Sequence, residues 1–269
     1  MSDILNDFST EALTAAIKAN LFEYYEYLGR SPKAELHEDA LMKWVLTGIP
    51  HSFLNNVLYT HLTTDNVDEV IQQTLASFRS RNITKLSWWT EPGTQPTDLR
   101  EHLVTHGLLY DQGAPGMAVN LPGLRDVSTP TGLTVKRVDN IEVLREFVHS
   151  AAIGFGLPEP SESICFDLFA SLGFDLPLIN YIGYISGEPV ATAELFLGAG
   201  VAGIYWVSTV PEARRKGIGL AMTQAPLWQA CEMGYTVGIL HSSEQGIDVY
   251  RQLGFVEQCL MSNYVWNAK

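Results

Sequence analysis

The sequence predicts an α/β (α+β) fold in two domains, on three observations. Short runs of alternating apolar residues, typical of strands, are interspersed with segments in which apolar residues recur every three or four positions, typical of helices. The length of 269 residues fits two domains of ~100–150 residues better than one. Residues 122–131 carry turn formers and little periodicity, so we place the linker there and predict domains at 1–128 and 129–269.

The elements of the first domain follow from periodicity and from glycine, proline and capping residues. Ser9 can cap a helix in which Leu13, Ile17 and Leu21 share one face, and Gly29 can end it. The same reasoning predicts a turn over 112–116, helices over 10–28, 36–46, 67–81 and 98–107, and strands over 52–61, 83–89 and 117–121.

The second domain alternates in the same way. Asp139 and Glu142 suggest a capping box at the start of a helix, and residues 186–189 form a tight turn between two strands. We expect a mobile loop over 154–160, helices over 139–152, 164–172, 220–233 and 247–253, and strands over 133–138, 180–185, 190–197, 203–210, 236–240 and 256–265.

The composition excludes several classes of partner. A net charge of −13, with a pI near 4.9, disfavours nucleic acid and anionic membranes, and weakly favours amines; acidity serving solubility is the alternative. The three cysteines form no Cys-x-x-Cys pair, the start of the chain has no apolar signal segment, and no run approaches ~18 apolar residues. We therefore expect a cytoplasmic monomer or homodimer.

A basic, glycine-containing turn follows the strand at 203–210. Gly217 and Gly219 allow a ligand close to the backbone, and the helix that begins there carries unpaired N–H groups and a positive partial charge. These features predict a phosphate or pyrophosphate site. The spacing of the glycines does not match a Walker loop, and Met222 stands where the dinucleotide fingerprint needs a third glycine.

Two motifs in the second half resemble one family. Arg214-x-x-Gly217-x-Gly219 resembles the coenzyme A pyrophosphate loop of the GNAT superfamily of N-acetyltransferases, and the stretch from Glu244 through Tyr250 to Leu-Gly-Phe255 resembles its second motif. The order of elements over 133–265 is similar too. The resemblance implies two GNAT-like domains, each a mixed, mostly antiparallel sheet flanked by helices.

The first domain would be a degenerate copy. Leu99-x-x-x-Leu103-x-x-x-Gly107 resembles the end of the second motif. No Arg-x-x-Gly-x-Gly loop precedes it, and residues 89–96 occupy that position instead. We therefore expect a tandem, bacterial type of chain with no coenzyme bound in its first half. An unrelated α/β or helical domain is the alternative.

The resemblance implies acetyl-CoA as co-substrate and assigns residues to it. Pantetheine would lie along the main chain of the strand at 205–210. The pyrophosphate would lie on the N–H groups of residues 216–220. Arg215 and Lys216 could equally be solvated, Arg214 could equally fix the loop, and Ser242 is an alternative to Ser243. The assigned residues are Val207, Ser208, Thr209, Val210, Arg214, Arg215, Lys216, Gly217, Ile218, Gly219, Leu220 and Ser243.

Two residues are candidates for proton transfer. Tyr250 is the candidate acid, because a phenol of pKa ~10 is protonated at neutral pH and can donate to a thiolate; the alternative is simple packing. Glu194 is the candidate base, and an exposed glutamate paired with lysine is the alternative. His241 and Glu244 are second choices. No residues have metal-ligand spacing, so we expect no metal.

The acceptor is expected to be a small-molecule or peptide amine. It would bind among the 154–160 loop and the hairpin strands, with Phe155, Tyr184 and Trp206 as candidate lining residues. Two other functions stay open at this point. One is an acetyl-CoA-binding sensor or scaffold without turnover, and the other is transfer of longer acyl chains.

Overall fold

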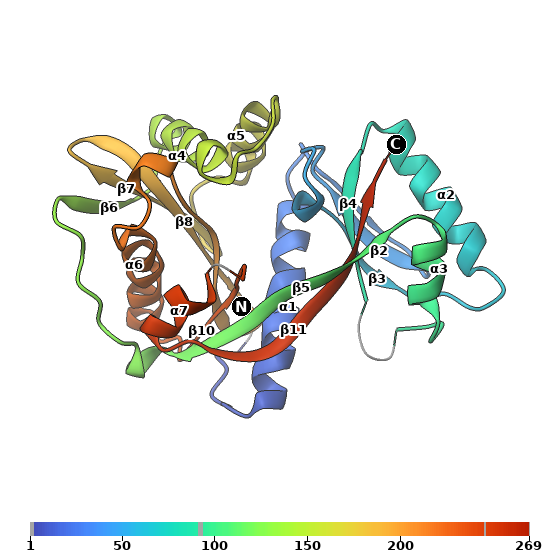
Figure 1. Cartoon of the computed structure of the whole chain (residues 1–269), viewed down its shortest axis with the longest axis horizontal. Helices are drawn as coiled ribbons and strands as arrows, with labels where there is room; N and C mark the ends of the chain where they lie inside the picture. Colours follow the sequence, from blue (N-terminus) through green and yellow to red (C-terminus); the bar gives the residue numbers. More distant parts are fainter. Residues whose placement is uncertain (1–2, 91–93, 245, 269) are drawn as a thin grey trace. The chain divides into compact units, whose positions relative to one another are not determined.

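The computed structural model describes residues 3–90, 94–244 and 246–268 of the chain (Figure 1). Within these residues the α-helices are α1 Thr10–Leu28, α2 Val67–Ser80, α3 Leu99–Thr105, α4 Ile141–Phe155, α5 Ser161–Leu172, α6 Ile218–Glu232 and α7 Ile247–Leu253. The strands are β1 Glu35–Glu38, β2 Met42–Leu46, β3 Asn55–Thr60, β4 Lys85–Trp89, β5 Leu109–Asn120, β6 Leu133–Arg137, β7 Leu178–Ile185, β8 Glu188–Gly198, β9 Val201–Thr209, β10 Val237–His241 and β11 Val256–Asn267. Short 3₁₀ turns occupy Ser52–Leu54, Leu121–Gly123 and Pro211–Ala213.

The chain forms two compact units that are interleaved along the sequence. Unit 1 comprises Met1–Tyr24, Ala114–Glu162 and Gly173–Leu260, and unit 2 comprises the remaining segments. Residues 3–24 therefore belong to the same unit as most of the second half of the chain. The division of the chain into domains 1–128 and 129–269 stays a prediction.

The sheet of unit 1 is mixed and mostly antiparallel. Its strands follow the order β5-β10-β9-β8-β7-β6, and β9 and β10 are a parallel pair within it. The parallel pair is connected through α6, as a crossover between parallel strands requires. The predicted fold class, a mixed and mostly antiparallel α/β arrangement, is confirmed here.

Helices cover both faces of this sheet. On one face, apolar side chains of β8 such as Ala193 and Leu195 pack with Met222 and Leu227 of α6. Because successive strand residues point to opposite faces, Glu194 lies on the other face. Part of that face is covered by α1, whose Tyr24 ring contacts Phe196 and Tyr205.

Unit 2 has a smaller sheet, in the order β1-β2-β3-β4-β11. Its β3 and β4 are parallel and joined through α2, which buries the apolar face formed by Val67, Ile71, Leu75 and Phe78. The β3–α2–β4 segment therefore has the same topology as β9–α6–β10 of unit 1. Residues 91–93, part of the 89–96 stretch that we compared with the basic loop, lie outside the described residues.

Most predicted elements are confirmed within one to three residues, including α1 and α7 with their predicted bounds. The helix predicted over 36–46 is wrong: the chain forms the β1–β2 hairpin there. The Asp39 carboxylate accepts hydrogen bonds from the N–H groups of Leu41 and Met42, which closes a turn instead of a helix.

Three smaller predictions also differ. The turn over 112–116 is wrong because β5 continues through it, and Pro115 contributes its carbonyl to the N–H of Ser242. The cap of α4 is Asn140, whose side chain accepts from Val143 N, and not Asp139. The helix α4 extends through Phe155 to a left-handed Gly156, so the 154–160 segment begins inside a helix.

Candidate active site

The parallel pair β9 and β10 separates in the middle of unit 1. Pairing joins Ala202–Ile204 to Gly238–Leu240 and stops there, although β9 continues to Thr209. Beyond Ile204, the edge of β9 that faces β10 has no partner strand among the described residues. An unpaired strand edge presents backbone N–H and C=O groups that an extended, amide-containing ligand can use.

A bulge in β9 fixes where its side chains point. The register with β8 shifts between Thr192 and Glu194, and Trp206 adopts a left-handed conformation with φ of 47°. Such a conformation is uncommon for a residue with a bulky side chain and often marks a functional position. The bulge allows Tyr205 and Trp206, neighbours in sequence, both to contact Tyr24.

A hollow of about 410 Å³ lies at the N-terminus of α6. Gly217 caps the helix with a φ of 77°, which a residue other than glycine rarely adopts. A Cβ on Gly219 would come no closer than 4.0 Å to any neighbour, the hydroxyl of Thr209, so the space over this glycine is open. The hollow is lined by Thr209, Ala213, Arg214, Arg215, Gly217, Ile218, Gly219, Leu220, Val249 and Gln252.

Two of the three cations of the turn, Arg214 and Lys216, donate to main-chain carbonyls. Arg214 donates from Nε to the carbonyl of Thr209 at 3.0 Å and from a terminal nitrogen to that of Gly154 at 2.8 Å. Lys216 donates to the carbonyl of Glu212 at 3.2 Å. Arg214 therefore connects the end of β9 to the last turn of α4, which supports its alternative role of fixing the loop.

The main chain of Val210 is used inside the protein. Its N–H donates to Val190 and its carbonyl accepts from Ala213. The neighbouring Ser208 has a buried hydroxyl bonded to that of Thr192, at 2.8 Å. Both main-chain groups of Val210 are thus already hydrogen-bonded within the protein.

Glu194 is fully buried, and the alternative of an exposed glutamate paired with lysine is wrong. Burial raises its pKa to about 8, against a smaller lowering by the hydroxyl of Tyr24. Neither carboxyl oxygen makes a hydrogen bond of normal distance and angle to any described residue. Its neighbours across the sheet are Asn180 on β7 and Tyr205 on β9.

His241 is the last residue of β10, and its ring contacts that of Tyr205. The two rings stack with their centroids 6.2 Å apart, and burial lowers the pKa of His241 to about 4, so the ring is neutral at physiological pH. Its two ring nitrogens, like the Oδ1 of Asn180, are buried without a hydrogen bond inside the described part of the chain. Buried polar atoms of this kind usually bind water or a ligand.

Tyr250 lies half-buried on α7. Burial raises its pKa to about 12, and its ring contacts Phe255 edge-on, with the centroids 6.0 Å apart. It also packs against the core of unit 1, which is compatible both with the role of acid and with the alternative of simple packing. Ser243 is exposed just beyond β10, and Ser242 is buried.

Two of the candidate lining residues touch each other. The ring of Phe155, at the end of α4, meets the ring of Trp206 edge-on at 5.6 Å between centroids. The hydroxyl of Tyr184 instead donates to the carboxylate of Glu146 on α4. Phe155 is 46% exposed, which leaves much of this aromatic ring open to solvent.

Sequence reasoning missed two residues of this region, Asn20 and Tyr24, because α1 lies in the first half of the chain. Both are fully buried on the sheet of unit 1. The available signal was a polar Asn20 one turn before Tyr24, on the otherwise apolar face that also carries Ile17 and Leu21.

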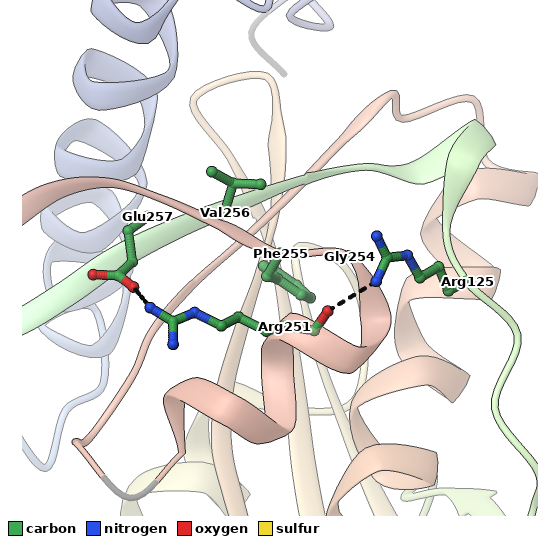
Figure 2. Close-up of a pocket in the computed structure, with 6 residues that line it drawn as sticks. All are labelled: Arg125, Arg251, Gly254, Phe255, Val256 and Glu257. Carbon is green, nitrogen blue, oxygen red and sulfur yellow. Dashed lines mark hydrogen bonds and ion pairs between the residues drawn. The ribbon is translucent and has the colours of Figure 1, made fainter.

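A second hollow, of about 360 Å³, lies beside α7 and is drawn in Figure 2. The guanidinium of Arg251 is paired with Glu257, as Figure 2 shows. It is also paired with Asp248, at 2.9 Å. Arg125 donates to the main-chain carbonyl of Arg251 at 3.3 Å. Because Arg251 is already neutralised by two carboxylates, this hollow is less suited to an anion than the one at α6.

Among the described residues, no group of three or more His, Cys, Asp or Glu could hold a metal ion. Among the helices that the structure describes, none combines the length and the apolar character that crossing a bilayer requires.

Comparisons with known proteins agree with this description of the fold. A family model described as "Acetyltransferase (GNAT) family" matches residues 145–255. None of the curated proteins matches the sequence.

Solved structures of the same fold cover nearly the whole chain. A GCN5-related N-acetyltransferase from Kribbella flavida is 19% identical, with a TM-score of 0.66, over 98% of this chain and 97% of its own. One from Sphaerobacter thermophilus is 15% identical, with a TM-score of 0.58, over 94% and 90%. A tandem GNAT protein of the clavulanic acid biosynthesis pathway, solved without AcCoA, is 13% identical, with a TM-score of 0.55, over 98% and 96%.

These similarities agree with the geometry of unit 1. The matched residues contain the bulged β9, the helix that carries Tyr250, and Gly217 and Gly219, which we call the glycine cradle because they line the hollow at the N-terminus of α6. Residues 145–255 therefore match the model of the GNAT acetyltransferase family, in a chain with the fold of GNAT proteins.

Proposed function

We propose that this chain transfers an acetyl group from acetyl-CoA to a primary amine of a small molecule or peptide. The observation that carries the proposal is the open glycine cradle at the N-terminus of α6, next to the unpaired edge of β9. A helix N-terminus favours pyrophosphate, and a free strand edge favours the amides of pantetheine. When bound, acetyl-CoA supplies an activated thioester.

The residues that would hold the coenzyme are those implied by the family resemblance. The N–H groups of Lys216 to Leu220 would bind the pyrophosphate, with Arg215 adding positive charge from the rim of the hollow. The main chain of Val207, Ser208 and Thr209 would face the pantetheine, and Val210 would contribute less. Ser243 would contact it from the end of β10.

Glu194 would act as the general base. The acceptor amine must lose a proton before it can attack, and a buried carboxylate with free acceptor capacity can take that proton directly or through water. A carboxyl whose pKa is about 8 is matched to this task near neutral pH. A bound alkylammonium would also stabilise the carboxylate by its charge.

Tyr250 would act on the leaving group. Its pKa of about 12 means that it keeps its proton until the departing sulfur becomes negative. Because that value is above the ~8.5 of a thiol, Tyr250 would act largely as a hydrogen-bond donor to the sulfur. The packing against Phe255 would hold its ring in place.

The wider properties of the chain are part of the same proposal. We expect a cytoplasmic, bacterial protein, monomeric or homodimeric, that needs no metal. Residues 1–128 would be a degenerate GNAT-like domain that binds no coenzyme. At the start of α2, which corresponds in topology to α6, stand Asp68 and Glu69, and their charge opposes the binding of an anion.

The test combines binding with turnover. Calorimetry would compare acetyl-CoA binding to the wild type and to Gly219→Tyr, whose side chain would fill the cradle. Gly123→Tyr, at an exposed glycine outside the cradle, is the matched control. We expect binding to be lost only in Gly219→Tyr, and thiol release with at least one amine of a panel. Equal binding in all three proteins would refute the site; binding without release from any amine would favour the sensor.

A further inference from the structure

Helix α1 places two polar side chains, Asn20 and Tyr24, on the face of the unit 1 sheet that carries Glu194. They are one turn apart and therefore share one side of the helix. Both are fully buried. A buried amide and a buried hydroxyl on an apolar helix face require partners, and their partners indicate two different roles.

Asn20 attaches the helix to the sheet. Its side chain donates to the carbonyl of Gly198 at 2.8 Å and accepts from the hydroxyl of Tyr205 at 2.7 Å. A Cβ on Gly203 would lie 2.1 Å from the Asn20 oxygen, so this close approach requires glycine. The hydrogen-bonding capacity of Asn20 is thus used to fix the position of α1.

Tyr24 is held rigidly from two directions. Its ring stacks on Tyr205, with the centroids 4.2 Å apart and the planes 5° from parallel. The indole N–H of Trp206 donates to its hydroxyl oxygen at 2.7 Å. Because that oxygen accepts from Trp206, its own proton is available to another acceptor. Glu194 lies directly across the sheet from Tyr205, the residue on which the Tyr24 ring stacks, and the hydroxyl of Tyr24 lowers the pKa of its carboxyl.

We propose that Tyr24 is a positioning residue for Glu194: its hydroxyl, oriented by the Trp206 indole, donates to the carboxylate and fixes its direction toward the acceptor. This inference rests on the proposed role of Glu194 as base. The left-handed backbone at Trp206 is part of the arrangement, because it brings the indole to the same side as Tyr205.

The other groups around Glu194 leave Tyr24 as the one that stabilises its charge. Tyr205 and His241 are the titratable groups toward β9 and β10, and His241 is neutral at physiological pH. Asn180 faces it from β7 and does not titrate. The ionisable residues of α4, which also packs on this sheet, are exposed: Glu142, Arg145, Glu146 and His149. Within the part of the chain that the structure describes, no charged side chain shifts the pKa of Glu194.

Removal of the hydroxyl has a predictable sign. Tyr24→Phe keeps the stacked ring but removes the donor, so the carboxylate becomes less stable and the pKa of Glu194 rises further. The acid limb of kcat/KM then moves to higher pH, and kcat/KM at neutral pH falls about tenfold, the usual effect of losing one hydrogen bond to a charged group. A purely structural role would lower stability without moving this limb.

The experiment measures Glu194 with and without turnover. Carboxyl-carbon NMR titrations of ¹³C-glutamate-labelled protein give its pKa directly, with the resonance assigned through Glu194→Gln. Tyr25→Phe is the matched control, since Tyr25 is the next residue on the helix and is also buried. We expect a raised Glu194 pKa in Tyr24→Phe alone. If that variant does not fold, Trp206→Phe removes the donor behind the hydroxyl and should shift the same resonance in the same direction.

The outcomes distinguish this inference from the proposed function. An unchanged Glu194 pKa in folded Tyr24→Phe overturns the positioning role, whatever the activity. Full thiol release by Glu194→Gln overturns the proposed base while the NMR result still tests the contact. A raised pKa with a matching shift of the acid limb, absent in Tyr25→Phe, supports the inference.

Discussion

Glu194→Gln should make the protein more stable at alkaline pH while abolishing acetyl transfer. The buried carboxyl has a pKa of about 8, raised from its ordinary 4.5 by burial. In the unfolded chain the same group ionises at the ordinary value. Below the pKa of the unfolded chain, 4.5, the carboxyl is neutral in both states and costs no stability. Stability is then lost as the pH rises from this value through the pKa of the folded protein, about 8.

The magnitude follows from these two pKa values. Between about pH 5 and about pH 9, ionisation of Glu194 lowers the free energy of unfolding of the wild type by about 4 kcal/mol. Glutamine has nearly the same shape and does not ionise, so the variant avoids this loss. All other titrating groups are common to both proteins and cancel in the difference.

The assay is urea unfolding followed by tryptophan fluorescence at several pH values. The difference in free energy of unfolding between variant and wild type should grow with pH by about that amount. Glu188→Gln is the control, because Glu188 lies exposed on the same strand. A difference that does not change with pH, or that changes equally in Glu188→Gln, would refute the argument that Glu194 is buried and weakly paired.

Three further predictions concern the same unit. Tyr250→Phe should lower kcat by about tenfold or more, with the thermal midpoint nearly unchanged; loss of stability with unchanged kcat would indicate packing alone. Arg214→Ala removes two hydrogen bonds between the loop, Thr209 and Gly154, so it should cost about 1 kcal/mol of stability and weaken acetyl-CoA binding in calorimetry; unchanged values of both would contradict a fixing role. Finally, kcat/KM should rise with pH toward the Glu194 pKa of about 8; a profile that is flat from acid to alkaline pH would speak against Glu194 as base.

The sequence alone determined most local structure and the family motifs. Helix α1 begins and ends where Ser9 and Gly29 predict, because capping and hydrophobic periodicity act over a few residues. The open hollow at the start of α6 was predictable for the same reason: Gly217 and Gly219 define it within one turn of chain. The hairpin at 35–46 was missed because a single turn around Asp39 outweighed a helical pattern.

The tertiary structure alone decided what surrounds Glu194. Its burial, and hence its raised pKa, depends on α1, which is about 170 residues away in the sequence. The bulge at Trp206 depends on the register between β8 and β9, which no local pattern specifies. Local motifs thus predicted where a coenzyme would bind, whereas the protonation of the candidate base follows from long-range contacts that only folding creates.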